Sequence, residues 1–222
     1  MSLCRDMNCP DAVSPDSAEA PPRSRGYRMV ARADAAARTH QRIIDAAFEL
    51  YSEHDFEQVS LEDVAARADV TVRTVLRRFG GKEALLEAVA QAGDQAVEDR
   101  RRDVPAGDAA AAVRCVVGDY ERYGDPIMRL LSQEERVPAF RQIADRGRRL
   151  HYDWVERTFA PQLSRRERPA RRRLRAELIA ITDVYTWKLL RRDLRLGRKA
   201  TAEVLDEMVA AVTASKRSEG SR

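Results

Sequence analysis

The sequence predicts an all-α protein with two helical domains, and three observations support this fold class. Glycine and proline are scarce, with 10 and 9 residues among 222. The helix-favouring residues alanine, leucine, arginine and glutamate are abundant instead. Apolar residues make up 44% of the chain and recur in most segments with the 3.6-residue period of a helix. We therefore expect almost no β-sheet.

The first 32 residues combine prolines with small and charged side chains. Too few apolar residues are present to offset the entropy of ordering, so a disordered tail is expected at 1–32. Its basic end could reach phosphates or a minor groove, although a solubilising leader is the simpler interpretation. Neither a signal peptide nor a membrane-spanning stretch is predicted, so we expect a soluble, cytoplasmic protein with no membrane contact.

Beyond the tail, apolar periodicity and helix-breaking residues divide the chain into successive helices. One helix is expected from Asp34 to about Glu53, followed by two short helices and a linking helix from Lys82 to about Arg102. Glycine and proline positions then mark the later breaks. Further helices are predicted at 108–123, 126–135, 138–160, 167–192 and 201–214, with a frayed tail at 216–222.

The two short helices begin and end with recognisable capping residues. Ser60, with Asp63 three residues later, forms an approximate capping box and begins a helix that ends near residue 67 or 68. Thr71 caps the next helix, and Gly80 and Gly81 end it. Two short helices so close together predict a helix-turn-helix.

The residues between these caps fit the way in which two such helices cross. Ala65 is small enough for the crossing, and Asp69 tolerates the left-handed backbone that the turn requires. Val70 and Val75 supply the apolar contacts that hold the pair together. A three-helix DNA-binding domain is therefore predicted at 33–81.

The stretch at 38–86 resembles the TetR (tetracycline repressor) family of bacterial transcription factors. The resemblance rests on Ile43-Ile44-Asp45-Ala46-Ala47, Phe56, Ser60 with Val64-Ala65, and DVTVRTVLRRFGGKEALL at 69–86, where Phe79 followed by Lys82, Glu83 and Leu85 is the most specific part. It implies that the third helix enters the major groove and that Lys82 contacts phosphate. Two positions depart from the family pattern: Asp69 stands where glycine is usual, and Leu76 where a phosphate-contacting tyrosine is usual.

Positive charge gathers on the second helix of the motif, although acidic residues outnumber basic ones in the domain as a whole. Arg73 and Arg77 are four residues apart and share a face, which suits contact with base edges or phosphates. A solvated helix face is the alternative. The predicted DNA-binding residues are Ser60, Thr71, Val72, Arg73, Thr74, Leu76, Arg77, Arg78 and Lys82.

The predicted helices at 167–192 and 201–214 are apolar over more of their surface than a single contact requires. Paired across a two-fold axis they would form a four-helix bundle, which is also how the TetR family dimerises; a purely intramolecular core is the alternative. Such a homodimer would hold two recognition helices about 34–36 Å apart, on successive major grooves of a palindromic operator. The predicted interface residues are Leu178, Ile181, Tyr185, Leu189, Val204, Leu205, Met208 and Val212.

A mostly apolar pocket for a small-molecule effector could form within the domain predicted at 82–215. Ordinary core packing is the alternative, because aromatic residues at helical spacing more often belong to a core. The candidate ligand-binding residues are Cys115, Asp119, Tyr123, His151, Trp154 and Tyr185.

The remaining motifs limit the function further. The three cysteines are odd in number and suggest neither disulfides nor a metal site. No Gly-rich phosphate loop, metal-ligand spacing or Gly-x-Ser-x-Gly elbow is present, so neither an enzyme nor a cofactor is expected. The arginine run from Arg165 to Arg175 is interpreted as a solvated connector, with an anionic effector or a second nucleic-acid contact as the alternatives.

Together these patterns favour a transcriptional repressor that a small molecule releases from double-stranded DNA. In this hypothesis the effector favours a dimer whose recognition helices no longer match the groove spacing. The alternative is an architectural DNA-binding protein that responds to no ligand.

Overall fold

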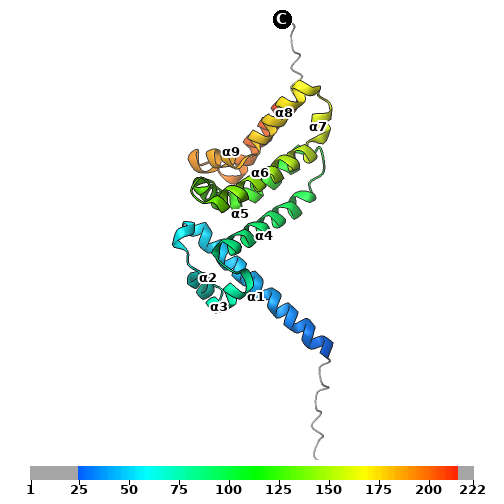
Figure 1. Ribbon diagram of the computed structural model, residues 1–222. Helices are drawn as coiled ribbons and strands as arrows, with labels where there is room; N and C mark the ends of the chain where they lie inside the picture. Colours follow the sequence, from blue (N-terminus) through cyan, green and yellow to red (C-terminus); the bar gives the residue numbers. More distant parts are fainter. Residues whose placement is uncertain (1–24, 215–222) are drawn as a thin grey trace, which may run out of the picture. The chain divides into compact units, whose positions relative to one another are not determined.

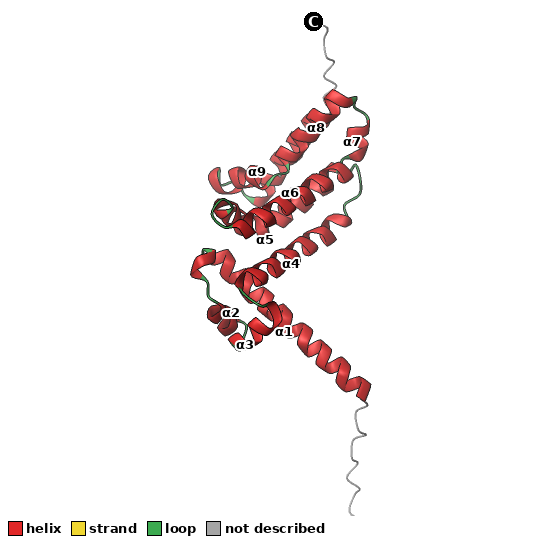
Figure 2. Ribbon diagram, in the orientation of Figure 1, coloured by secondary structure: helices red, strands yellow, loops and turns green. Residues whose placement is uncertain are grey.

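The computed structural model describes residues 25–214, and all regular elements of this part of the chain are helices (Figures 1 and 2). This confirms the predicted all-α class. The elements are α1 (Arg25–Glu53), η1 (Phe56–Gln58), α2 (Leu61–Arg67), α3 (Val72–Phe79), α4 (Lys82–Arg102), α5 (Ala109–Gln133), α6 (Pro138–Thr158), α7 (Ala160–Ser164), α8 (Arg168–Ile181), α9 (Val184–Lys188), η2 (Leu189–Asp193, a π-helical turn) and α10 (Arg198–Ala214). Within residues 25–214, no helix is long and apolar enough to cross a membrane.

Helix α1 begins earlier than the sequence pattern predicts. It starts at Arg25, so residues 25–32 are helical and the prediction of disorder is wrong for them. The segment that follows is rich in alanine, which has the highest intrinsic helix propensity, and this propensity extends the helix although few of its side chains are buried. Residues 1–24 and the predicted tail at 216–222 lie outside the described residues. The chain divides between Arg38 and Thr39 into two compact units.

In the second unit, the end of α1 packs with α2, α3 and the start of α4 around one apolar cluster. Ile43, Val64, Val75 and Leu85 are fully buried in it. The turn between α2 and α3 has Asp69 at a φ of 52°, in the left-handed conformation predicted for this position. The local rules of helix capping and turn geometry therefore place α3 as the sequence predicts.

Helix α5 is continuous, whereas the sequence pattern predicts a break at Gly124-Asp125-Pro126. Pro126 lies inside the helix, where it removes one backbone hydrogen bond. Packing against α9 and α10 holds the helix together across this point. Gly124 makes the packing possible, because a Cβ atom there would lie 2.3 Å from the ring of Trp187. The two predicted helices at 108–123 and 126–135 are therefore one.

The helix predicted at 167–192 is divided, in contrast, into α8, α9 and η2. The side chain of Thr182 donates to the carbonyl of Leu178 at 2.7 Å, and the carboxylate of Asp183 accepts from the backbone of Tyr185 at 2.9 Å. Short polar side chains that bond the backbone in this way compete with helix continuation. The break redirects the chain so that α9 packs against α5.

The C-terminal helices enclose the largest apolar cluster of the described residues. Trp154, Phe159, Leu178 and Trp187 are at most 2% exposed in it. Helices α5 and α8 each pack against both α6 and α10, and Figure 1 shows α5, α6 and α8 lying side by side. This scaffold positions the charged and aromatic groups described below.

Candidate DNA-binding and effector sites

Both short helices of the helix-turn-helix are fixed at their N-termini by side-chain caps. Ser60 and Asp63 form the predicted capping box: the backbone of Asp63 donates to Ser60 Oγ at 3.1 Å, and the backbone of Ser60 donates to the Asp63 carboxylate at 2.9 Å. These hydrogen bonds lower the pKa of Asp63. Thr71 caps α3 by accepting from the backbone of Thr74 at 3.2 Å. The caps define the direction of α3 relative to α2.

The outer face of α3 presents two arginines to solvent. Val75 is fully buried, whereas Arg73 and Arg77 are exposed, as their spacing predicts. Neither guanidinium forms an ion pair or hydrogen bond with another described residue. Leu76, 44% exposed, lies between them in sequence, and Thr71 is exposed at the start of the helix. Four of the nine predicted DNA-binding residues are thus exposed.

The other five predicted DNA-binding residues are half-buried: Ser60, Val72, Thr74, Arg78 and Lys82. Ser60 and Thr74 take part in the caps, and Val72 packs against the apolar cluster. Arg78 has a buried Nε atom without a hydrogen-bond partner. The ammonium group of Lys82 lies 4.3 Å from the ring centroid of Phe56, a cation–π contact that links the start of α4 to η1.

Five of the six predicted effector residues line one cavity of about 340 Å³, bounded mainly by α4, α5, α6 and α9. We call it the C-terminal cavity. Its predicted lining residues are Asp119, Tyr123, His151, Trp154 and Tyr185. Cys115 does not line it, and this prediction is corrected. The Cys115 side chain turns toward α4, with Sγ 4.0 Å from the carbonyl oxygen of Arg100, because α5 rotates it away from the cavity wall.

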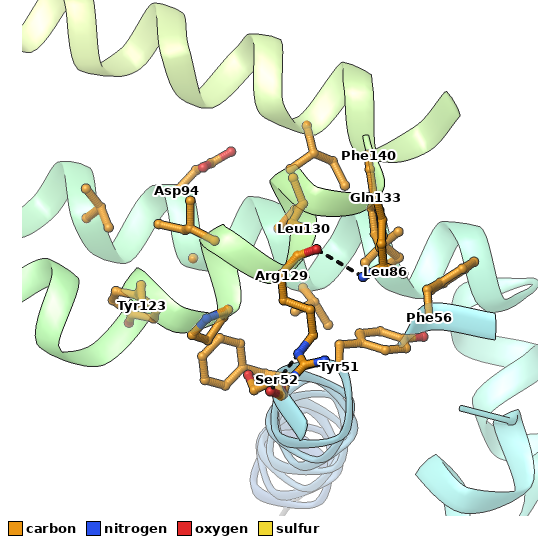
Figure 3. A pocket seen from close by; sticks show the side chains of 18 residues that line it. Tyr51, Ser52, Phe56, Leu86, Asp94, Tyr123, Arg129, Leu130, Gln133 and Phe140 are labelled. Carbon is orange, nitrogen blue, oxygen red and sulfur yellow. Dashed lines mark hydrogen bonds between the residues drawn. The ribbon is translucent and has the colours of Figure 1, made fainter. Parts of the chain in front are cut away.

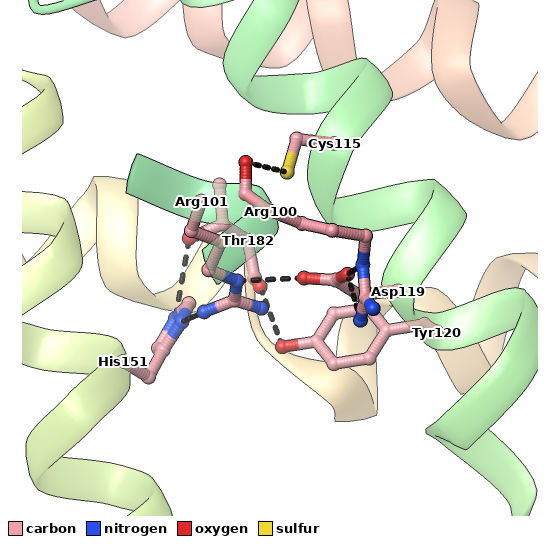
Figure 4. A network of polar contacts seen from close by, with 7 residues as sticks. All are labelled: Arg100, Arg101, Cys115, Asp119, Tyr120, His151 and Thr182. Carbon is pink, nitrogen blue, oxygen red and sulfur yellow. Dashed lines mark hydrogen bonds and ion pairs between the residues drawn. The ribbon is translucent and has the colours of Figure 1, made fainter. Parts of the chain in front are cut away.

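A buried charged network lies at the inner end of this cavity (Figure 4). Asp119 is 2% exposed and pairs with two arginines of α4, with Nη2 of Arg100 at 2.8 Å and Nε of Arg101 at 2.7 Å. The guanidinium of Arg101 also lies 4.7 Å from the ring centroid of Trp154. Two guanidinium groups thus share one carboxylate, which leaves an excess of positive charge in the network. Sequence reasoning identified Asp119 but missed both arginines, because they lie 18 and 19 residues away along the chain.

His151 completes the network from α6. Its Nδ1 atom is 3.5 Å from Nη1 of Arg101, and its Nε2 atom is 3.3 Å from the hydroxyl of Thr182. The Thr182 hydroxyl already donates its proton to Leu178, so the imidazole must donate from Nε2 and accept at Nδ1. A neutral imidazole satisfies both contacts.

The comparisons with known proteins agree with this geometry. Residues 43–89 match the model of a family described as bacterial regulatory proteins, tetR family. Over this segment the chain is similar to the TetR family, as the sequence predicts. The match supports the predictions of a DNA-binding transcriptional regulator and of a protein that is not an enzyme. No curated protein matches the sequence.

Solved structures share the fold of this chain. A transcriptional regulator from Rhodococcus sp. RHA1 is 17% identical, with 78% of this chain and 95% of that chain covered and a TM-score of 0.62. A tetR-family regulator from Streptomyces coelicolor is 21% identical, with coverages of 78% and 80% and a TM-score of 0.59. A structure described as a SmeT–triclosan complex is 20% identical, with coverages of 78% and 90% and a TM-score of 0.60.

The predicted dimer residues fall into two groups. Leu178, Ile181 and Leu205 are at most 6% exposed in the core of the chain itself, so they are withdrawn from the predicted interface. The intramolecular packing of α8 and α10 buries them. The other five remain at least partly accessible: Tyr185, Leu189 and Met208 are exposed, and Val204 and Val212 are half-buried.

The arginine run from Arg165 to Arg175 is partly engaged in helix packing. Arg171 and Arg175 pair with Glu156 of α6 at 3.3 and 2.5 Å. Arg166 donates to the carbonyl of Thr213 in α10 at 2.7 Å. Part of the run therefore ties neighbouring helices together and does not act as a simple connector.

The buried His151 should make the stability of the folded chain depend on pH. Burial, followed by the charge of Arg101, lowers the pKa of His151 from 6.5 to about 4. The unfolded chain then binds more protons than the folded chain between these values, so stability falls as the pH drops from 6.5 to about 4, by about 3 kcal/mol in total from this group. Urea unfolding at pH 7.5, 6.0 and 5.0 measures this loss. In a His151→Gln variant the free energy of unfolding should lack this dependence on pH. An equal pH dependence in the wild type and the variant would contradict the prediction.

Proposed function

We propose that the chain is a homodimeric repressor that reads a palindromic operator with α3 and is released by a small-molecule effector. The exposed Arg73 and Arg77, on a recognition helix that Thr71 caps, carry this proposal. An arginine fork matches guanine in the major groove, and rigid capping fixes where the fork lies. The excess of positive charge at α3 also attracts the phosphate backbone.

Homodimerisation is supported by exposed apolar side chains near the C-terminus. Tyr185, Leu189, Leu194 and Met208 are 53%, 49%, 59% and 38% exposed. Their sequence neighbours in α8–α10 form the core of the C-terminal domain, so a rigid surface underlies them. A second copy of the chain would cover this surface, and the resulting two-fold symmetry matches a palindromic operator.

The C-terminal cavity supports the effector part of the proposal. Its walls combine aromatic rings with a few polar groups, which is typical of small-molecule sites. The likeness to the structure described as a SmeT–triclosan complex is consistent with a small-molecule effector. Ligand and operator would then weaken each other's binding by the same factor.

Selection of bound sites from random double-stranded DNA tests the function. We expect enrichment of one palindromic sequence whose half-sites lie about one helical turn apart or at a multiple of that spacing. Enrichment of a single half-site without symmetry would contradict the dimeric arrangement. Binding without any sequence preference would favour the architectural alternative.

The dimer surface can be tested with a single charged residue. In a two-fold dimer both copies of the chain carry the Met208→Lys substitution, so two unpaired charges would be buried in the interface. The dimer dissociation constant should therefore rise by on the order of 100-fold. Met29→Lys is the matched control, because Met29 is 68% exposed and lies far from α10 in sequence. Light scattering across a dilution series measures the mass. A dimer equally stable in both variants would exclude Met208 from the interface.

A further inference from the structure

A second cavity, which we call the junction cavity, lies where the DNA-binding helices meet the C-terminal domain (Figure 3). Its volume is about 160 Å³. Tyr51 and Phe56 form its wall on the side of α1 and η1, and Leu86, Leu130 and Phe140 form its wall on α4, α5 and α6. Tyr123 is the only predicted effector residue that also lines it. The junction cavity adjoins the C-terminal cavity but contacts a different set of elements.

Two buried polar atoms of the junction cavity have no hydrogen-bond partner. They are the hydroxyl oxygen of Tyr51 and Oε1 of Gln133. Gln133 is 2% exposed, and its amide nitrogen donates to the carbonyl of Arg129 at 3.0 Å, while its amide oxygen accepts nothing. Buried polar atoms are nearly always paired, so these two indicate a missing partner. A ligand hydroxyl, which both donates and accepts, can pair with either atom.

The rest of the cavity wall limits what carries that hydroxyl. Most lining side chains are aromatic or aliphatic, so the remainder of a ligand must be apolar. A cavity of about 150 Å³ lined by apolar side chains holds one benzene ring. We propose that the junction cavity binds a single-ring aromatic alcohol, of which phenol is the simplest, and that its occupancy alters DNA binding.

Contacts on the cavity wall link an occupant of the junction cavity to DNA binding. This step rests on the proposed function. The ring of Phe56 lies 5.6 Å from that of Tyr51 and 5.5 Å from that of Phe140. The same ring lies beneath the ammonium group of Lys82, directly after the recognition helix. A ligand that presses on Phe56 therefore acts on a side chain that positions Lys82.

Arg129 provides a second link across the junction. From α5 it donates to the carbonyl of Ser52 at 3.2 Å and to the carboxylate of Asp55 at 3.3 Å. Arg129, Ser52 and the adjacent Tyr51 all line the cavity. The end of α1 is thus tied to the C-terminal domain at the cavity itself, and an occupant affects both sides of this tie.

Two glycines on facing helices allow a matched test of the site. Gly93 of α4 lines the junction cavity, and Gly147 of α6 lines the C-terminal cavity. A Cβ atom at either position meets nothing within 4 Å, so both accept a larger side chain. Leucine also raises helix propensity at both positions. Gly93→Leu and Gly147→Leu should therefore both fold, which circular dichroism and urea unfolding verify.

Calorimetric titration of the full chain with phenol tests occupancy. We expect one phenol to bind per chain in the wild type and in Gly147→Leu, and binding to be lost in Gly93→Leu. Loss in Gly147→Leu with retention in Gly93→Leu would place phenol in the C-terminal cavity and overturn the proposal. So would the absence of saturable binding by the wild type.

Gln133→Met tests recognition of the hydroxyl, because methionine has a similar shape and no acceptor oxygen. Phenol affinity should fall about three- to tenfold, as expected for one lost hydrogen bond. Affinity for toluene, which lacks a hydroxyl, should not fall. An equal loss for both ligands would show that Gln133 acts only on the shape of the cavity.

The regulatory step is measured separately on the selected DNA site. Phenol should change DNA affinity, and DNA should change phenol affinity by the same factor. Phenol binding without any change in DNA affinity would overturn the regulatory step. Failure of the wild type to bind DNA would overturn the proposed function instead, and the calorimetric result would still stand for the site.

Discussion

Replacing both Arg73 and Arg77 with alanine is expected to weaken operator binding about 30-fold or more, because each bidentate contact to a base contributes about 1–3 kcal/mol of discrimination. Both side chains are exposed on α3, and neither forms an ion pair or a hydrogen bond with another described residue. Their removal should therefore leave folding intact, and the loss should appear in DNA binding alone. Fluorescence anisotropy with a labelled operator, at fixed salt, measures the change.

The single variants separate the roles of the two arginines. A residue that reads a base should lose affinity for the operator more than for random DNA when it is replaced. A residue that contacts phosphate should weaken both equally and reduce the magnitude of the salt slope by about 1. The salt dependence of binding separates the two roles. Only loss of a phosphate contact reduces the salt slope equally for the operator and for random DNA.

Arg172→Ala is the matched control, since Arg172 is also exposed but lies on α8. It removes one positive charge, as each single α3 variant does, and should leave operator affinity nearly unchanged. Equal losses in the control and in the α3 variants would mean that total charge, and not the recognition helix, determines binding. Unchanged affinity in the double variant would remove α3 from the DNA interface.

The recognition helix could be predicted from sequence because its determinants are local. Ser60 with Asp63, Thr71 and Asp69 each act within three or four residues, through caps and a turn that need no distant partner. The family resemblance rests on the same residues. Here local preference and tertiary packing agree.

The errors occur where distant packing outweighs local preference. Pro126 marks a helix end by local rules, yet α9 and α10 hold α5 together across it. In α8 the prediction fails in the other direction, because Thr182 and Asp183 bond the backbone and end a helix that apolar periodicity alone would extend.

The candidate sites show the same limit. Leu178 and Met208 both lie on apolar helical rows, but only the packed structure shows that Leu178 is fully buried and Met208 is 38% exposed. The residues Asp119, His151 and Trp154 meet in one cavity as predicted. The junction cavity was not predicted, because its walls come from helices that are far apart in sequence and Gln133 carries no local signal.

Asp119→Leu should destabilise the chain by about 3–5 kcal/mol, because it leaves the guanidinium of Arg101 buried without a counter-charge. Arg101 is 6% exposed and cannot turn to water without disrupting its contact with Trp154. The Arg100 side chain, 42% exposed, is already partly hydrated and should contribute little. Urea unfolding at pH 7.5 measures the free energy.

Asp125→Leu on the same helix is the control for burial. Asp125 accepts two hydrogen bonds from Arg192, at 2.7 and 2.8 Å, which are as short as those of Asp119, but its side chain is 62% exposed. Solvent screens this pair, so its loss should cost no more than about 1 kcal/mol. The comparison then shows how much access to water weakens hydrogen-bonded ion pairs of similar length.

The double variant Arg101→Met with Asp119→Leu separates charge from shape. It removes both buried charges and replaces them with apolar groups of similar size, so it should recover most of the stability lost in Asp119→Leu. If the double variant is as unstable as the single one, the loss comes from disturbed packing around Trp154 and not from an uncompensated charge. Recovery would show that the fold is as stable with an apolar pair as with the buried charges. The role of Asp119 would then be to make the C-terminal cavity polar.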